Sequence, residues 1–73
     1  MSILHRIRTY RKQELAALYF PQAAPRIAVH HLMRWINRCP PLLAELEACH
    51  YRRHAKVFTA RQVALIFRHL GEP

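Results

Sequence analysis

Residues 25–38 read PRIAVHHLMRWINR, and their apolar side chains recur with the period of an α-helix. At about 100° per residue, one arc of this helix collects Ala28, Val29, Leu32, Met33, Trp35 and Ile36. Pro25 suits the first helical position, where a missing N–H has no intrahelical partner to lose. Pro40 and Pro41 follow, and the residue before a proline avoids the helical conformation. We therefore predict an amphipathic helix from Pro25 to about Arg38, with Trp35 in the core.

The opposite arc of this helix is polar and carries no carboxylate. It consists of Arg, His and Asn residues with one apolar exception, Ile27. Its members are Arg26, Ile27, His30, His31, Arg34, Asn37 and Arg38. Solvated faces of soluble proteins normally mix charges of both signs. Arg and Asn also have bidentate reach to guanine and adenine edges. This arc is therefore a candidate DNA-reading surface, on which Ile27 suits contact with a thymine methyl group. An ordinary solvated face is the alternative.

Three more helices are expected around this one. Arg11 to Tyr19 is typical of a short helix, and a proline-bracketed turn over residues 20–25 separates it from the helix at Pro25. Another short helix is predicted from Pro41 to Ala48. The last helix starts after Thr59, which forms a capping box with Gln62, and it ends at Gly71. Its apolar stripe is formed by Val63, Ile66, Phe67 and Leu70.

Two extended segments complete the expected fold. Leu4 to Tyr10 alternates loosely and suits a short strand or an extended lead-in. Tyr51 to Phe58 has β-favouring residues around a basic centre and suits a strand or a small hairpin. We predict one mainly α domain over residues 1–73. Its expected architecture is a small helix-turn-helix or winged-helix-like domain, with about four helices and a minimal strand pair or hairpin.

The charge balance is strongly basic, with 12 Lys and Arg against 4 acidic residues and a net charge of +8. Ten of those cations are Arg, and the chain contains no Asp. A surplus this large on so short a chain indicates a polyanionic partner, either nucleic acid or an anionic membrane surface. Residues 39–51 contain Glu45 and Glu47 and no Lys or Arg. This acidic stretch separates two basic stretches, residues 1–38 and 52–73.

Several protein classes are not expected. The single Gly excludes a glycine-rich phosphate loop, and the lack of Asp removes the commonest acid partner of a catalytic His. We therefore expect no enzyme, no catalytic residue and no cofactor. The longest apolar run, residues 15–21, is too short to span a bilayer. Two Cys make no disulfide framework and fit a reducing cytoplasm.

The order of elements resembles that of winged helix-turn-helix domains of the MerR and excisionase types. The matching residues are Tyr10-x-x-x-Glu14-Leu15-Ala16-x-Leu18, Trp35, Tyr51-Arg52-Arg53 and Phe58-Thr59-x-x-Gln62-Val63-x-x-Ile66. The resemblance implies that the helix at residues 25–38 enters the major groove. It also implies a wing that touches the DNA backbone through Arg52, Arg53, His54 and Lys56. The chain departs from this pattern in lacking the customary Gly in the turn and in inserting Pro40-Pro41-Leu42-Leu43 before the wing.

Nearly the whole chain also resembles a family of short bacterial proteins of unknown function. The motifs are Glu14-Leu15-Ala16-x-Leu18-Tyr19-Phe20-Pro21, Arg34-Trp35-Ile36, Phe58-Thr59-x-x-Gln62-Val63 and Leu70-Gly71-Glu72-Pro73. This resemblance implies one compact domain and no particular site.

Two further clusters have competing interpretations. The basic N-terminal run belongs either to an arm that reaches a DNA groove or to a solvated edge strand; its residues are Arg6, Arg8, Arg11 and Lys12. Four side chains have the chemistry of zinc ligands: Cys39, Cys49, His50 and His54. The two Cys lie ten residues apart, which is not the spacing of a zinc knuckle, so we expect no metal.

The resulting functional hypothesis is a small basic protein that binds duplex DNA. A regulator, an excisionase-like factor and an architectural accessory factor all fit it. One module makes few base contacts, so we expect a homodimer, an array or a larger protein partner. The alternative is an adaptor without catalytic activity that uses the basic face for an acidic protein. Binding to a membrane surface is disfavoured because the core needs the apolar arcs.

Overall fold

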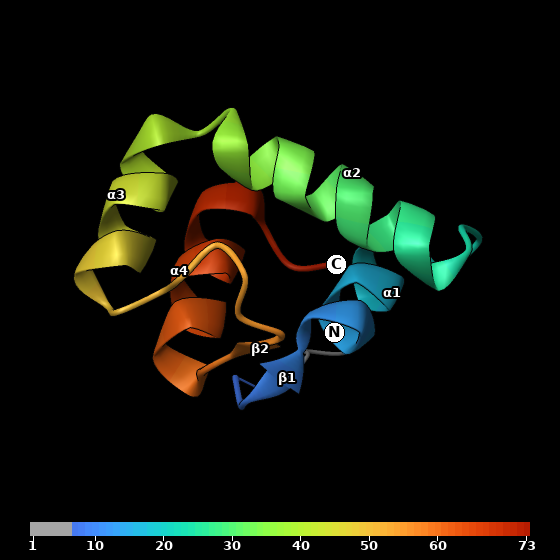
Figure 1. The fold of residues 1–73 in the computed structure, drawn as a ribbon, viewed down its shortest axis with the longest axis horizontal. Helices are drawn as coiled ribbons and strands as arrows, with labels where there is room; N and C mark the ends of the chain where they lie inside the picture. Colours follow the sequence, from blue (N-terminus) through green and yellow to red (C-terminus); the bar gives the residue numbers. More distant parts are fainter. Residues whose placement is uncertain (1–6) are drawn as a thin grey trace, which may run out of the picture.

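Four helices and one short antiparallel strand pair make up residues 7–73, the part of the chain that the computed structural model describes (Figure 1). In chain order the elements are β1 (Tyr10–Arg11), α1 (Lys12–Tyr19), α2 (Pro25–Asn37), α3 (Pro40–Ala48), β2 (Val57–Phe58) and α4 (Ala60–Leu70). The predicted fold class, a small mainly α domain with a minimal strand pair, is confirmed. Each of the four predicted helices is present, with ends within one or two residues of those expected.

Local sequence accounts for the ends of α1 and α2. The Glu14 carboxylate accepts a hydrogen bond from the Arg11 backbone N–H at 3.0 Å, at the beginning of α1. Pro25 is the first residue of α2, as predicted. This helix has no side-chain cap and no acidic residue in its first turn. The buried stripe of α2 consists of Ala28, Leu32 and Ile36, and it packs toward α1 and α3.

The ends of α4 also follow the prediction. The Thr59 hydroxyl accepts from the Gln62 backbone N–H at 3.3 Å, and the Gln62 side chain accepts from the Thr59 N–H at 3.0 Å. Gln62 is buried, and its amide nitrogen donates to the Cys49 carbonyl at 2.9 Å. The capping box therefore also attaches α4 to the segment that follows α3. The helix ends before Gly71, whose φ of +85° favours glycine.

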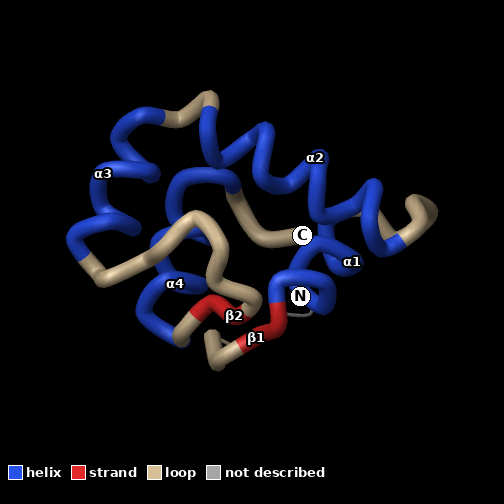
Figure 2. The backbone as a smooth tube through the Cα atoms, viewed as in Figure 1, coloured by secondary structure: helices blue, strands red, loops and turns tan. Residues whose placement is uncertain are grey.

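The strands differ from the prediction. β1 pairs with β2, with Tyr10 opposite Phe58 and Arg11 opposite Val57 (Figure 2). Residues 51–58 were expected to form a strand or a small hairpin, and only Val57 and Phe58 are in a strand. Residues 51–56 form a loop with a turn, in which the Ala55 N–H donates to the Arg52 carbonyl at 2.9 Å. The buried, stacked rings of Tyr51 and Phe58 hold the two ends of this loop, with 5.4 Å between ring centroids.

Residues 4–10 were expected to form a short strand or an extended lead-in, and among the described residues of this segment only Tyr10 is in a strand. Residues 4–6 lie outside the described residues, and residues 7–9 are not in a strand. Within residues 7–73, no helix is long and apolar enough to cross a bilayer.

The prediction for Trp35 is also wrong, since its side chain is 42% exposed and not in the core. Successive residues on a helix are about 100° apart, so Trp35 lies well to one side of buried Ile36. The indole packs edge-on against Phe20 and Tyr19, with centroids 4.7 Å and 6.0 Å away. Trp35 therefore covers the rim of the core between α1 and α2. Among the tyrosines, Tyr10 and Tyr51 are buried and Tyr19 is half-buried.

Candidate nucleic-acid interface

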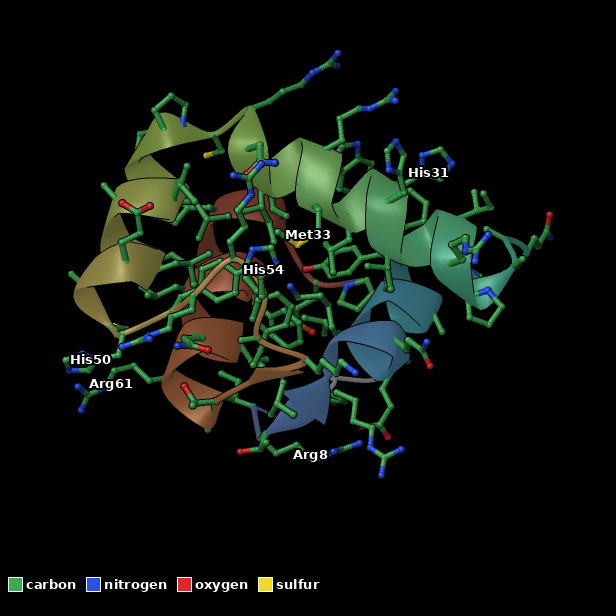
Figure 3. All side chains as sticks on the ribbon, in the orientation of Figure 1. Arg8, His31, Met33, His50, His54 and Arg61 are labelled. Atoms are coloured by element: carbon green, nitrogen blue, oxygen red, sulfur yellow. The ribbon has the colours of Figure 1, made fainter. Side chains whose placement is uncertain are left out.

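The polar arc of α2 is exposed, as its sequence pattern predicts. Six of its seven predicted site residues are exposed and one, His31, is partly buried; the six are Arg26, Ile27, His30, Arg34, Asn37 and Arg38. Figure 3 shows His31 on the outer side of α2. The Arg34 guanidinium lies 3.4 Å from the His30 ring nitrogen. The ion pairs within residues 7–73 are Arg8 with Glu14 and His69 with Glu45, and neither involves a residue of α2. The cations of this arc are therefore available to an anion from outside the chain.

The second predicted cluster lies in the loop between α3 and β2. Its four members are exposed: Arg52, Arg53, His54 and Lys56. The turn described above gives Arg53 and His54 the two central positions, where side chains project from the loop. These residues are thus placed by a turn and not by the two strands of a wing.

Lys12 and Tyr51 fix this loop to the helices. The Lys12 ammonium donates to the Tyr51 hydroxyl at 3.0 Å and to the Arg53 carbonyl at 3.2 Å. The Tyr51 hydroxyl lies 3.6 Å from the sulfur of Met33 on α2. Burial lowers the pKa of Lys12 and raises the pKa of Tyr51, although the charge of Arg53 acts in the opposite direction on Tyr51. The loop is therefore connected to both α1 and α2 through side chains.

The loop and α2 face each other across an open groove of about 600 Å³. Its lining consists of Arg11, Lys12, Gln13, Arg26, Val29, His54, Ala55, Lys56 and Val57. We call this feature the basic groove, because five of its lining residues are Arg, Lys or His and none is Asp or Glu. A smaller hollow of about 230 Å³ lies between α2, α3 and the loop. Asn37 of α2, Glu47 of α3 and Arg53 of the loop are among the residues that line it.

The basic groove joins only part of the predicted site. It brings Arg26 together with His54 and Lys56, whereas Arg52 and the outer residues of α2 do not line it. It adds Arg11 and Lys12, which the sequence shows only as part of a basic N-terminal run. The sequence included these two residues only in the run that could form an N-terminal arm, and no local signal brings them beside Arg26 and the loop. The β1–β2 pairing, which places Arg11 opposite Val57, brings them there.

Arg6 and Arg8 of the predicted N-terminal arm differ in whether the structure describes them. Arg6 lies outside the described residues. The Arg8 guanidinium lies over the Tyr10 ring, 3.8 Å from its centroid, and 3.9 Å from the Glu14 carboxylate. It also donates to the Thr9 carbonyl at 2.7 Å. Arg8 therefore rests against the domain, at the bottom of the view in Figure 3.

The four side chains with zinc-ligand chemistry are not gathered into a site. In the described part of the chain, no three His, Cys, Asp or Glu side chains form a group that could hold a metal ion. Cys39 and Cys49 are free thiols, each partly buried.

A partly exposed aromatic cluster occupies the other flank of α2. Phe20 contacts both Trp35 and His31, with centroid distances of 4.7 Å and 5.2 Å. On a helical wheel, Trp35 and His31 lie on the opposite side of the buried stripe from Val29 and Arg26, which line the basic groove. The solvent side of α2 is thus bounded by aromatic rings along one flank and by the basic groove along the other.

Comparisons with known proteins give a family and no activity. A comparison with curated proteins gave no match, and neither did a comparison with solved structures. A family model described as a domain of unknown function, DUF4248, matches residues 6–73. That range includes all the helices and strands and every residue that lines the basic groove. The expected resemblance to a family of unknown function is confirmed, and the chain belongs to the DUF4248 family.

Proposed function

We propose that this protein binds duplex DNA through α2 and the loop at residues 52–56. The observation that carries the proposal is the carboxylate-free exposed arc of α2. Its first-turn residue Arg26 lies across the basic groove from the basic residues of the loop. Arg and Lys side chains displace counterions from DNA phosphates, and this release favours binding. The net charge of +8 adds long-range attraction. A regulator, an excisionase-like factor and an architectural factor remain the roles that fit.

The two clusters suit different contacts. α2 has 13 residues, which gives a length of about 20 Å, and the major groove is wide enough to admit one helix. The residues of its exposed arc with bidentate reach to bases are Arg26, Arg34, Asn37 and Arg38. The cations of the loop suit phosphate contacts, which position a protein on DNA without reading its sequence.

The test is a titration of labelled duplex DNA at several salt concentrations. Neutralisation of about four to six phosphates predicts a log–log slope of about −4 to −5. The variant Arg34→Ala/Arg38→Ala removes two charges from α2, and Arg61→Ala/Arg68→Ala removes two exposed charges from α4. We expect the α2 variant to lose at least about tenfold in affinity and the α4 control much less. Absence of binding at low salt, or equal loss in both variants, would contradict the proposal.

One observation favours the alternative function, an adaptor for an acidic protein. Ile27 and Trp35 are large apolar side chains on α2 with 46% and 42% exposure, and Arg34 lies between them in the chain. Protein interfaces are enriched in aromatic residues and Arg. If the DNA titration gives no binding, this surface is the next candidate. An acidic protein partner should then be lost when Trp35 is replaced by Ala.

A further inference from the structure

We infer that the basic groove is a phosphoester site, and that in the DNA complex it holds one backbone phosphate with its sugar beside α2. The second part of this inference rests on the proposed function. The first part concerns the groove alone and can be tested without DNA.

Basic side chains from three separate segments converge in the groove. Arg11 and Lys12 come from the β1–α1 junction, Arg26 from the first turn of α2, and His54 and Lys56 from the loop. Like charges that are brought together repel one another unless an anion lies between them. None of the residues that line the groove is acidic, so the chain itself does not supply that anion there. A phosphate group has the charge and the acceptor oxygens that this set of donors lacks.

The walls of the groove are already held in place. The Lys12 backbone N–H donates to the Lys56 carbonyl at 2.8 Å, next to the paired residues Arg11 and Val57. The Lys12 ammonium is engaged with Tyr51 and the Arg53 carbonyl. This leaves the exposed side chains of Arg11, Arg26, His54 and Lys56 to contact a ligand. A ligand that enters a pre-formed site loses less free energy to the ordering of loops.

The lining also indicates what the phosphate is attached to. Val29, Ala55 and Val57 contribute apolar surface among the cations, and Val57 is 42% exposed. Apolar surface of this kind suits the carbon atoms of a sugar, whereas a bare phosphate ion is hydrated on all sides. The volume of about 600 Å³ lies within the range of ligand sites, about 300–1,000 Å³, and exceeds what one phosphate fills. These features favour a sugar phosphate unit, as in a DNA backbone or a free nucleotide.

The experiment uses two probes and two charge-matched variants. The full chain is titrated with thymidine monophosphate and, separately, with a short duplex, and backbone amide signals are followed by NMR. The groove variant is Arg26→Gln/Lys56→Gln, and the control is Arg61→Gln/Arg68→Gln. All four residues are exposed, and Figure 3 places Arg61 at the opposite corner of the view from the first turns of α2. Thermal melts of both variants check that each one folds.

We expect both probes to shift the amide signals of residues 11–12, 26 and 54–57. The groove variant should lose at least about tenfold in duplex affinity relative to the control, and its salt slope should fall by about two units. If the duplex binds but the groove variant behaves like the control, the phosphoester site is wrong and the DNA proposal stands. If only the nucleotide binds, and the groove variant abolishes it, the site is correct and the DNA proposal fails. If neither probe shifts these signals, the inference is overturned.

Discussion

Trp35 and Ile36 are neighbours in the chain but lie in different environments on α2. Ile36 is fully buried in line with Ala28 and Leu32, whereas Trp35 is 42% exposed at the rim. The indole is held by edge-on contacts with Tyr19 and Phe20. At the scale of single residues, the size of an apolar side chain is therefore a poor guide to its contribution to the stability of this domain.

Replacement of these two residues by Ala should affect stability in the opposite order to their sizes. Ile36→Ala should lower the free energy of unfolding by about 2–5 kcal/mol, because it leaves a cavity in the core. Trp35→Ala should cost about 1–2 kcal/mol, since it removes aromatic edge contacts and only part of a burial. Urea denaturation of the two variants measures both values. An equal or larger loss for Trp35→Ala would show that the indole is a core residue after all.

At the scale of single elements, the beginning of α2 combines two features that do not favour a helix. Arg26 stands in its first turn, where the positive end of the helix dipole disfavours a cation. The turn contains no acidic residue, and no side chain caps it. A position that breaks a local rule without a visible gain in stability is often a functional one. Arg26 also lines the basic groove, which is consistent with that interpretation.

The variant Arg26→Glu should therefore separate stability from binding. An acidic side chain in the first turn should raise the free energy of unfolding by about 0.3–1 kcal/mol, while duplex affinity falls at least about tenfold. Arg38→Glu is the matched control, because it makes the same change of charge at the other end of α2, where a cation is favourable. That control should lose stability. Thermal melts and DNA titrations of both variants test this prediction, and a loss of stability in Arg26→Glu would contradict it.

At the scale of the whole molecule, two tyrosine hydroxyls connect segments that are distant in the chain. The Tyr19 hydroxyl donates to the Gly71 carbonyl, which joins the end of α1 to the residues after α4. Tyr51 joins the loop to Lys12 and to Met33. Burial raises the pKa of both phenols above the ordinary value of 10.0, and the charge of Glu72 adds to the effect at Tyr19. Both therefore remain protonated in the fold at a pH where the unfolded chain ionises.

This arrangement predicts a loss of stability in alkali. A group whose pKa is raised on folding contributes stability that is complete below its unfolded pKa and is lost as pH rises through the folded value. Lys12 acts in the opposite direction, because its pKa is lowered on folding and stability is gained as pH rises toward 10.5. The variant Tyr19→Phe should lose about 1 kcal/mol at neutral pH with the hydrogen bond to Gly71.

The measurement is the melting temperature from neutral pH to about pH 11. We expect the wild-type melting temperature to fall above about pH 10, and that of Tyr19→Phe to fall less steeply. The two curves should approach each other as the Tyr19 phenol ionises in the unfolded wild-type chain. Parallel curves would exclude Tyr19 as a source of the alkaline loss.

Local sequence was sufficient for the helices and for one surface of the candidate site. Pro25, the capping box of Thr59 with Gln62, and Gly71 mark helix ends through contacts within a few residues, so a pattern in the chain reveals them. The exposed arc of α2 follows in the same way from the period of the helix. The family of the chain was likewise expected from motifs in its sequence.

The basic groove and the environment of Trp35 depended on contacts between segments far apart in the chain. The pairing of β1 with β2 brings Arg11 opposite Val57. The stacking of Tyr51 on Phe58 holds a loop facing α2, where a strand or a small hairpin was expected. Strands of two residues carry too little pattern to predict their partners. Their pairing depends on how all the helices bury the shared core. The packing energy of that core belongs to the whole domain and not to any local segment. The same packing brings five basic residues into one groove.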